Sequence, residues 1–368
     1  MGVRQRAATY SAALAVLLAV VMTVSAGMGP VYIEPIAVTK VILNAVAVPV
    51  GMTLSSTPIS AGPLQAPAIE LVWHAPFSFG TERVHEQIVL GVRLPRIILG
   101  ATVGFALATA GTVMQGFFKN PMADPSIIGV SSGAAVGAVA FIVVPSAIPF
   151  GIGLRGAAFV GAVVTAFLVY LIATQSGRTP VATLLLAGIA VQAFLSAVIS
   201  FLQLYSGESL RQVVHWLMGH LGNARWGDVG VTVVLVPALF VIILAYGRDL
   251  NVLLLGEADA KSLGVEVERT KKILLVLSSV ITAAGVAVSG VIGFVGLIVP
   301  HMVRLIVGPD HRVLLPTAAL AGASFLVLTD TIARTALGGS DIPVGVVTAA
   351  LGAPFFLYLL RSREVHSL

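Results

Sequence analysis

The sequence predicts an all-α protein that crosses a membrane many times. Of its 368 residues, 57% are hydrophobic and only 10% are charged, and the mean hydropathy is +1.01. Apolar runs of about 20 residues, the length of a membrane-spanning helix, recur along the chain between short polar segments. We therefore expect about ten transmembrane helices in a single domain covering residues 1–368.

The composition also limits the classes of function. The chain has no cysteine, which excludes a disulfide framework, a thiolate metal site and a cysteine nucleophile. The net charge of +5 does not indicate a nucleic-acid partner, because the basic residues are spread between apolar segments and membrane topology explains them.

The first apolar run, Ala7–Met28, allows two interpretations. Val24-Ser25-Ala26 resembles the small-residue site at which a signal peptide is cleaved. The run is longer than the roughly 7 to 15 residues of a usual signal core, so we expect a retained first helix. A long connection, residues 29–92, follows; its seven prolines exclude one regular helix, and only Val38–Val48 suits a short helix at the membrane surface.

The next stretch is the most informative. Ile97–Phe118 is 22 almost wholly apolar residues, and the sequence is again apolar after Ile127. Pro121 and Pro125 remove backbone donors between them, so we expect a turn over Lys119–Ser126 that separates two helices.

Polar and small side chains mark this hairpin. Gln115, Asn120 and Asp124 are costly in hydrocarbon, so we expect them to meet protein or to line a water-filled path. Small residues in the first helix allow neighbouring helices to approach closely; they are Gly100, Gly104, Ala108 and Gly111.

Seven further helices complete the count. They are, in order, Gly156–Thr174, Val181–Leu204, Val229–Tyr246, Ile273–Val291, a short one within Gly293–Val307, Leu314–Ala333 and Pro343–Leu360. With ten crossings both termini lie on one side. A cytoplasmic amino terminus places 13 Lys and Arg residues inside and eight outside, which together make the 21 of the chain, so we expect both termini in the cytoplasm.

One polar segment, residues 247–272, is long enough to form a surface outside the membrane. Ten of its 26 residues are charged, five basic and five acidic. A short helix starting near Glu257 and stopped at Gly264 would place Ala260 and Leu263 on one apolar side, suited to a groove on another protein. A solvated loop is the alternative, and the residues alone do not decide between the two.

The chain shows no means of driving transport by itself. No lysine follows a glycine, so no phosphate-binding loop of the GxxxxGK[ST] type exists. Asp330 is the main carboxylate inside a predicted helix, and pairing with Arg334 one turn later explains it most simply. His301 we interpret as a structural group, and the histidines show no metal-site spacing. We predict no metal site and no cofactor.

An ordered series of motifs then resembles a known family. The motifs are RLPR (93–96), AGTVMQGFFKNPMADPSIIGVSSGA (110–134), LLLAG (184–188), WLMGHLG (216–222), LLLGEADAKSLGV (253–265), GVIGFVGLIVPHMVR (290–304), DHRVLLP (310–316), DTIAR (330–334) and IPVGVVTAALGAPFFLYLL (342–360). Together they span over two thirds of the chain and resemble the FecCD family of ABC importer permeases, whose members import ferric siderophores, haem or vitamin B12.

The resemblance implies an assembly. A permease with the type II importer fold pairs with a second copy, here expected as a homodimer in the cell membrane. Two cytoplasmic ATPase subunits hydrolyse ATP, so the permease itself is not an enzyme, and an external binding protein delivers the metal chelate. The translocation path lies between the two permease copies and opens by alternating access.

It also implies roles for particular residues. Gly256, Glu257, Leu263 and Gly264 match the cytoplasmic segment that couples to the ATPase. The outward arginines that meet acidic side chains of the binding protein correspond to Arg93, Arg96 and Arg334; on the residues alone, anchoring at the membrane interface is the other interpretation. The residues expected along the inner part of the path are Gln115, Asn120 and Met122.

Two departures from the family pattern leave questions open. Asp341 replaces the usual glutamate before the Ile-Pro-Val-Gly box, so its role is not assigned. The first external loop, residues 29–92, is longer than usual. The identity of the chelate, vitamin B12 or an iron chelate, is equally open, and an ion-coupled secondary transporter is the alternative from another class.

Overall fold

The computed structural model describes residues 2–46, 48–54, 59–61, 64–66, 69–145, 152–337 and 341–361. Seven of its helical segments are long and apolar enough to cross a membrane. They are α1 (Val3–Gly27), the continuous segment Arg83–Phe118 that ends in α4, α6 (Leu154–Ala173), α7 (Val181–Leu204), α9 (Trp226–Ala245), α12 (Val267–Ser289) and α14 (His311–Thr335). The expected helical fold class is thus confirmed.

Three shorter apolar helices fall where the other predicted spans lie. They are α5 (Val130–Val143), α13 (Val295–Val307) and α15 (Val344–Arg361). Two of them follow a chain reversal in which backbone dihedrals leave the right-handed region. Gly129 before α5 and Phe294 before α13 both have positive φ, so each helix starts only after an irregular turn.

The central helix α4 (Leu94–Phe118) begins earlier than its apolar run suggests. Helix α3 (Arg83–Glu86) and the π-helical segment Gln87–Arg93 lead into it without a break. Pro95 has no N–H to donate to the preceding turn, and the wider π-helical turn accommodates that loss without ending the helix. The helical segment thus includes the predicted apolar span Ile97–Phe118 and ends with it, but it starts 14 residues earlier, at Arg83.

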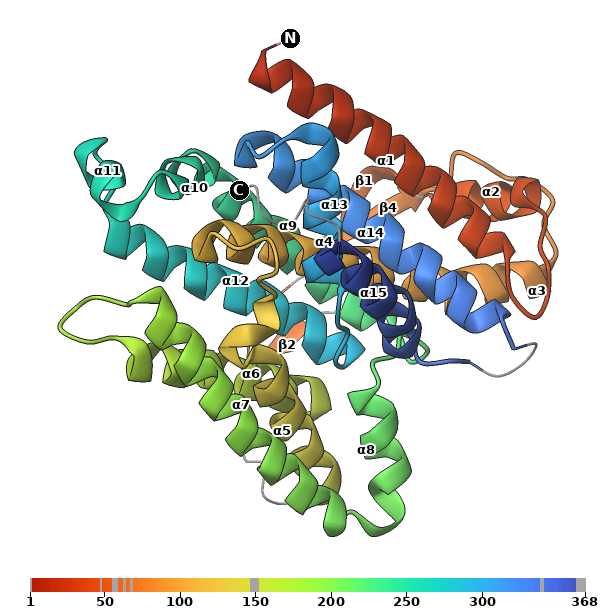
Figure 1. The fold of residues 1–368 in the computed structure, drawn as a ribbon. Coiled ribbons are helices and arrows are strands. Elements are labelled where there is room, and N and C mark those ends of the chain that lie inside the picture. The colour runs from red at the N-terminus through yellow and green to blue at the C-terminus, as the bar shows by residue number, and fades with distance from the viewer. Residues whose placement is uncertain are drawn as a thin grey trace.

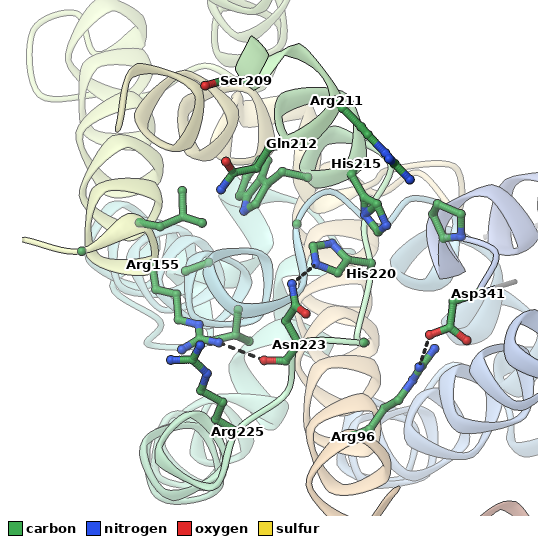
Figure 2. A pocket seen from close by; sticks show the side chains of 18 of the residues that line it. Arg96, Arg155, Ser209, Arg211, Gln212, His215, His220, Asn223, Arg225 and Asp341 are labelled. Carbon is green, nitrogen blue, oxygen red and sulfur yellow. Dashed lines mark hydrogen bonds and ion pairs between the residues drawn. The ribbon is translucent and has the colours of Figure 1, made fainter. Parts of the chain in front are cut away.

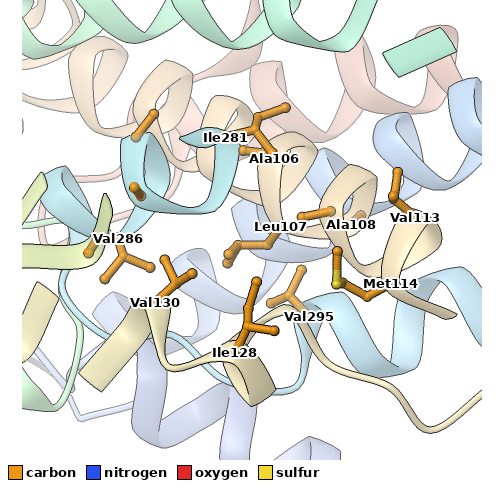
Figure 3. Packing of buried hydrophobic residues seen from close by; sticks show 14 of the residues in the cluster. Ala106, Leu107, Ala108, Val113, Met114, Ile128, Val130, Ile281, Val286 and Val295 are labelled. Carbon is orange, nitrogen blue, oxygen red and sulfur yellow. The ribbon is translucent and has the colours of Figure 1, made fainter. Parts of the chain in front are cut away.

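Small residues bring α4 against its neighbours at backbone distance, as the sequence predicts. A Cβ atom built on Gly104 would lie 2.2 Å from the carbonyl oxygen of Gly322 in α14, and one on Gly111 only 1.9 Å from that of Gly296 in α13. Apolar side chains of α4, α5, α12 and α13 fill the space around these crossings (Figure 3). Close backbone packing of this kind is the main source of helix association in a membrane.

The turn between α4 and α5 is present where the two prolines predict it. Lys119 ends α4 in the left-handed conformation, and Pro125–Ile128 forms a single 3₁₀ turn. The Asp124 carboxylate accepts hydrogen bonds from the backbone N–H and the hydroxyl of Ser126, which fixes the start of that turn.

The long connection contains more regular structure than expected. Helix α2 covers Pro35–Asn44, three residues ahead of the short helix predicted at Val38–Val48. Two antiparallel strand pairs follow: β1 (Val48–Leu54) with β4 (Ile69–His74), and β2 (Ile59–Ala61) with β3 (Leu64–Ala66). In the first pair Val48 is opposite His74, and a bulge lies between Pro49 and Gly51, where proline cannot donate to the ladder.

Two other polar segments are largely helical. The predicted loop 205–227 contains α8 (Leu210–Leu217), which buries Val213 and Trp216. Segment 247–272 contains α10 (Gly247–Leu254) and α11 (Glu257–Ser262), and α12 begins in it at Val267. α11 agrees with the short helix that the sequence predicted from Glu257 to Gly264 as one of two possibilities. Sequence hydropathy missed α8 and α10 because each has only one apolar face.

The elements outside the bundle gather at two opposite ends. The start of α1 lies on the same side as α10 and α11, whereas α2, α3 and α8 lie on the opposite side (Figure 1). We call these the α11 end and the α8 end.

Candidate functional site

The three arginines expected to dock a partner lie together at the α8 end. Each is at least nine-tenths buried, with exposed fractions of 5% for Arg93, 9% for Arg96 and 6% for Arg334. The π-helical segment supplies Arg93, the first turn of α4 supplies Arg96, and the last turns of α14 supply Arg334. The fold thus unites residues that are more than 200 positions apart.

Arg96 is the centre of this group. Its Nε and Nη2 donate to both oxygens of Asp330 at 2.9 to 3.1 Å, and its Nη1 donates to Asp341 Oδ2 at 2.7 Å. The expected pairing of Asp330 with Arg334 was wrong as the main explanation, since Arg334 Nε lies 4.0 Å away and Arg96 is closer. Asp341, whose role the sequence left open, is the second carboxylate of Arg96.

The other two arginines hold the end of α1. Arg93 Nη1 donates to the carbonyls of Ala26 at 2.7 Å and Gly27 at 3.1 Å, and its Nη2 donates to Val31 O. Arg334 Nη2 donates to the carbonyl of Ser25 and, at 2.6 Å, to its hydroxyl. Unsatisfied carbonyls at a helix C-terminus are thereby paired with cations, which also suits the helix dipole.

A cavity of about 1190 Å³ opens beside this group. It lies between the start of α6, helix α8, the end of α12 and the segment before α15. Arginine and histidine side chains dominate its polar lining (Figure 2); they are Arg96, Arg155, Arg211, Arg225, His215 and His220, with Glu208 and Asp341 as the acids.

Some of the charged side chains around the cavity form ion pairs and others do not. Arg155 forms an ion pair with Asp228, and Arg96 with the two aspartates described above. Arg211 and Arg225 are exposed, and neither forms an ion pair with another residue in the described ranges. The cavity rim therefore carries two exposed arginines without an ion-pair partner among the described residues.

Two histidines face each other across the cavity wall. The rings of His215 and His220 meet edge to face with centroids 4.4 Å apart, and Asn223 Nδ2 lies 3.2 Å from His220 Nε2. Burial, followed by the neighbouring His215, Arg96 and Arg155, lowers the pKa of His220 to about 4. His220 is therefore uncharged at neutral pH.

The residues expected along a translocation path lie near the turn after α4. Gln115 is fully buried and donates from Nε2 to the carbonyl of Leu297 in α13 at 2.8 Å, so it meets protein in this chain. Asn120 is exposed, and its Oδ1 accepts from the N–H of Met122 at 2.9 Å. Burial of the Asp124 carboxyl raises its pKa, against the effect of its two hydrogen bonds from Ser126.

The residues expected to couple to an ATPase lie at the α11 end. Gly256 and Gly264 flank α11 with φ of +128° and +85°, values that favour glycine. The side chain of Leu263 is 60% exposed, whereas Ala260 is fully buried, so the expected shared apolar side was wrong. Glu257 Oε1 accepts from Lys271 Nζ at 3.0 Å.

Sequence reasoning missed several residues that shape these sites. In the sequence, Lys271 is one of five basic residues in segment 247–272. Only Glu268, three residues earlier, indicates an ion pair with it. No sequence pattern indicates the ion pair between Arg155 and Asp228, because the two residues lie on different helices 73 positions apart. Among the described residues no three histidine or carboxylate side chains cluster as metal ligands would.

Comparisons with known proteins agree with this geometry. Residues 17–362 match the model of the FecCD transport family. The chain is 54% identical over 367 residues to a cobalamin import system permease protein of Halobacterium salinarum, covering 99% of this chain and 98% of the relative. It is 42% identical over 314 residues to a hemin transport system permease protein of Yersinia pestis, covering 84% and 94%.

A solved structure supports the same conclusion. The chain resembles a structure described as an inward-facing conformation of a putative metal-chelate type ABC transporter, with a TM-score of 0.77 and 32% identity over 95% of this chain and 98% of that one. The match to the family model covers well over half of the chain. The chain is an integral membrane protein that belongs to the FecCD transport family.

Proposed function

We propose that this chain is the permease subunit of an ABC importer that moves a metal chelate across the cell membrane by alternating access. The full-length relationship to import permeases carries the proposal. Relatives named for cobalamin and hemin import support a bulky metal chelate as the substrate class. The single domain would pair with a second copy to enclose the path.

The proposed topology has ten crossings with both termini in the cytoplasm. This number counts the seven long apolar helices and, of the four shorter ones, α5, α13 and α15 but not α2. The α11 end would then face the cytoplasm and the α8 end the outside, which agrees with the excess of Lys and Arg expected inside. A cytoplasmic α11 end makes the exposed Leu263 available to an ATPase.

The two ends would bind different partners. At the cytoplasmic end, Gly256, Glu257, Leu263 and Gly264 belong to the segment that contacts the ATPase. At the external end, the docking role of Arg93, Arg96 and Arg334 stays a prediction, and their buried positions favour an indirect form of it. They would hold α1, α4 and α14 in register, while the exposed Arg211 and Arg225 present charge to the binding protein.

The path itself would run along the turn after α4. Asn120 and Met122 are partly or fully exposed there, which suits a lining role once a second copy is present. Gln115 would act from behind this surface through its bond to α13.

Uptake into liposomes tests the proposal. The chain is co-expressed with a candidate ATPase and binding protein, reconstituted, and supplied with cyanocobalamin, hemin or a ferric siderophore in turn. We expect uptake of one chelate that needs internal ATP and stops when the ATPase carries a defective phosphate-binding lysine. Uptake that follows an imposed proton or sodium gradient without ATP would instead identify a secondary transporter.

A further inference from the structure

Lys271 is a buried cation whose three donors are all used. It lies in the second turn of α12, and its side chain is only 7% exposed. Its Nζ donates to the carbonyl of Thr179 at 2.8 Å, to Glu257 Oε1 at 3.0 Å and to Glu268 Oε1 at 3.3 Å. An ammonium group has three N–H donors, so this arrangement is complete.

The three acceptors come from three separate segments. Thr179 lies in the turn between α6 and α7, Glu257 begins α11, and Glu268 is in the first turn of α12. The N–H of Thr179 also donates to Glu268 Oε2 at 3.2 Å, so both backbone groups of Thr179 bond to this ion pair. A bridge between Gln175 and Arg178 closes the same turn tightly. We call this group the Lys271 joint.

The joint constrains relative motion. A buried ion pair resists the loss of one partner, because the remaining charge would be left without compensation. Displacing α11 from α12, or either from the α6–α7 turn, would remove one of the three acceptors of a side chain that is itself 7% exposed. The three segments are therefore expected to move as one body.

The Lys271 joint also bears on the role of Glu257. Its carboxylate turns toward Lys271, although half of its side chain remains exposed. Leu255 and Leu263, 63% and 60% exposed, provide the apolar surface at this end. The exposed leucines are thus distinct from the carboxylate that bonds to Lys271.

We propose that Lys271 is a positioning residue that transmits movement of the coupling segment 247–272 to α12 and to the α6–α7 turn, and that Glu257 serves it as a tether. This inference rests on the proposed function as an ATP-driven importer. It predicts variants in which the ATPase stays bound and hydrolyses ATP, but less chelate is transported per ATP hydrolysed.

The test compares four variants in the reconstituted complex with its ATPase and binding protein. Glu257→Gln leaves Lys271 bonded to Glu268 and Thr179, so the chain should fold; Lys271→Met removes the joint; Lys271→Arg keeps the charge. Leu263→Asp is the matched control for recruitment. The readouts are the amount of co-purified ATPase, the thermal midpoint, and chelate transported per ATP hydrolysed.

We expect Lys271→Met to keep ATPase recruitment within about twofold while transport per ATP falls about tenfold, in the range of ordinary coupling free energies. Glu257→Gln should show a smaller fall and Lys271→Arg a partial rescue. Leu263→Asp should instead lose the ATPase.

Two results would overturn the inference. One is normal transport per ATP in Glu257→Gln and Lys271→Met with the ATPase bound. The other is loss of recruitment in Glu257→Gln equal to that of Leu263→Asp, which would make Glu257 a contact and not a tether. Because the wild-type complex is measured beside them, absence of ATP-driven uptake there would count against the proposed function alone.

Discussion

Arg96 donates from all three of its guanidinium nitrogens to two carboxylates that differ in exposure. The side chain of Asp330 is 3% exposed and that of Asp341 is 53% exposed. A planar guanidinium suits this geometry because it can bond one carboxylate with two nitrogens and a second carboxylate with the third. A lysine at position 96 would lack the planar fork that bonds Asp330 through two nitrogens.

The difference in exposure gives a prediction at the residue scale. Asp330→Asn leaves a buried arginine with one exposed acid and should destabilise the protein by about 3 kcal/mol or more. Asp341→Asn removes a half-exposed partner, for which about 1 kcal/mol or less is expected. Thermal unfolding in detergent measures both. Equal shifts of the midpoint would show that Asp330 is not the main partner of Arg96.

The single residues also show where sequence reasoning ends. The arginines of the RLPR and DTIAR motifs were identified from the sequence, but Ser25 and Asp341 as their partners were not. A side chain's partner depends on which helices lie side by side, and hydropathy carries no information on that. For the same reason the Asp330–Arg334 pairing, inferred from i,i+4 spacing alone, gave way to a contact between α4 and α14.

At the scale of elements, length and hydropathy located the long apolar helices well and the amphipathic ones poorly. α7 matches its predicted bounds, Val181–Leu204, because Pro180 starts it and polar residues end it. α8 and α10 were not predicted, and the start of the segment leading into α4 was placed too late, because their polar faces hide a helical period. α11 lies where a short helix from Glu257 to Gly264 was one of the two predicted possibilities. The sequence did not predict the strands β1 to β4 in the connection between α2 and α3.

Glycine spacing was the better guide to packing, and it gives the element-scale prediction. Gly111→Ala forces α4 away from α13, since its Cβ would lie 1.9 Å from a carbonyl oxygen, and should cost about 2 kcal/mol or more. Gly230→Ala in α9 is the matched control, because nothing lies within 4 Å of its Cβ. There alanine should be neutral or stabilise by up to about 1 kcal/mol.

Thermal midpoints of the two variants in the same detergent give the comparison. A lowered midpoint for Gly111→Ala beside an unchanged or raised one for Gly230→Ala is the expected result. If both midpoints rise alike, the gain would come from helix propensity, and the close α4–α13 crossing would impose no cost on Gly111→Ala.

At the scale of the whole molecule, the two ends carry different chemistry. The α8 end has a cavity rim with two exposed arginines that no described acid neutralises, while the α11 end has exposed leucines beside a self-contained ion network. An apolar contact with a charged border suits a permanent partner, and a charged rim suits a partner that arrives by diffusion and leaves.

This asymmetry predicts how a binding protein docks. Arg211→Glu with Arg225→Glu should weaken its affinity for the reconstituted permease about tenfold at low salt, because two attractive charges become repulsive. The difference should shrink as ionic strength rises and the Debye length falls to about 8 Å near 0.15 M. Arg248→Glu with Lys261→Glu reverses two exposed cations at the α11 end, so it changes the net charge by the same amount, and it should leave the affinity unchanged. A titration of labelled binding protein against each variant at two salt concentrations measures this. An equal loss in the control variant would mean that net charge, and not the cavity rim, governs docking.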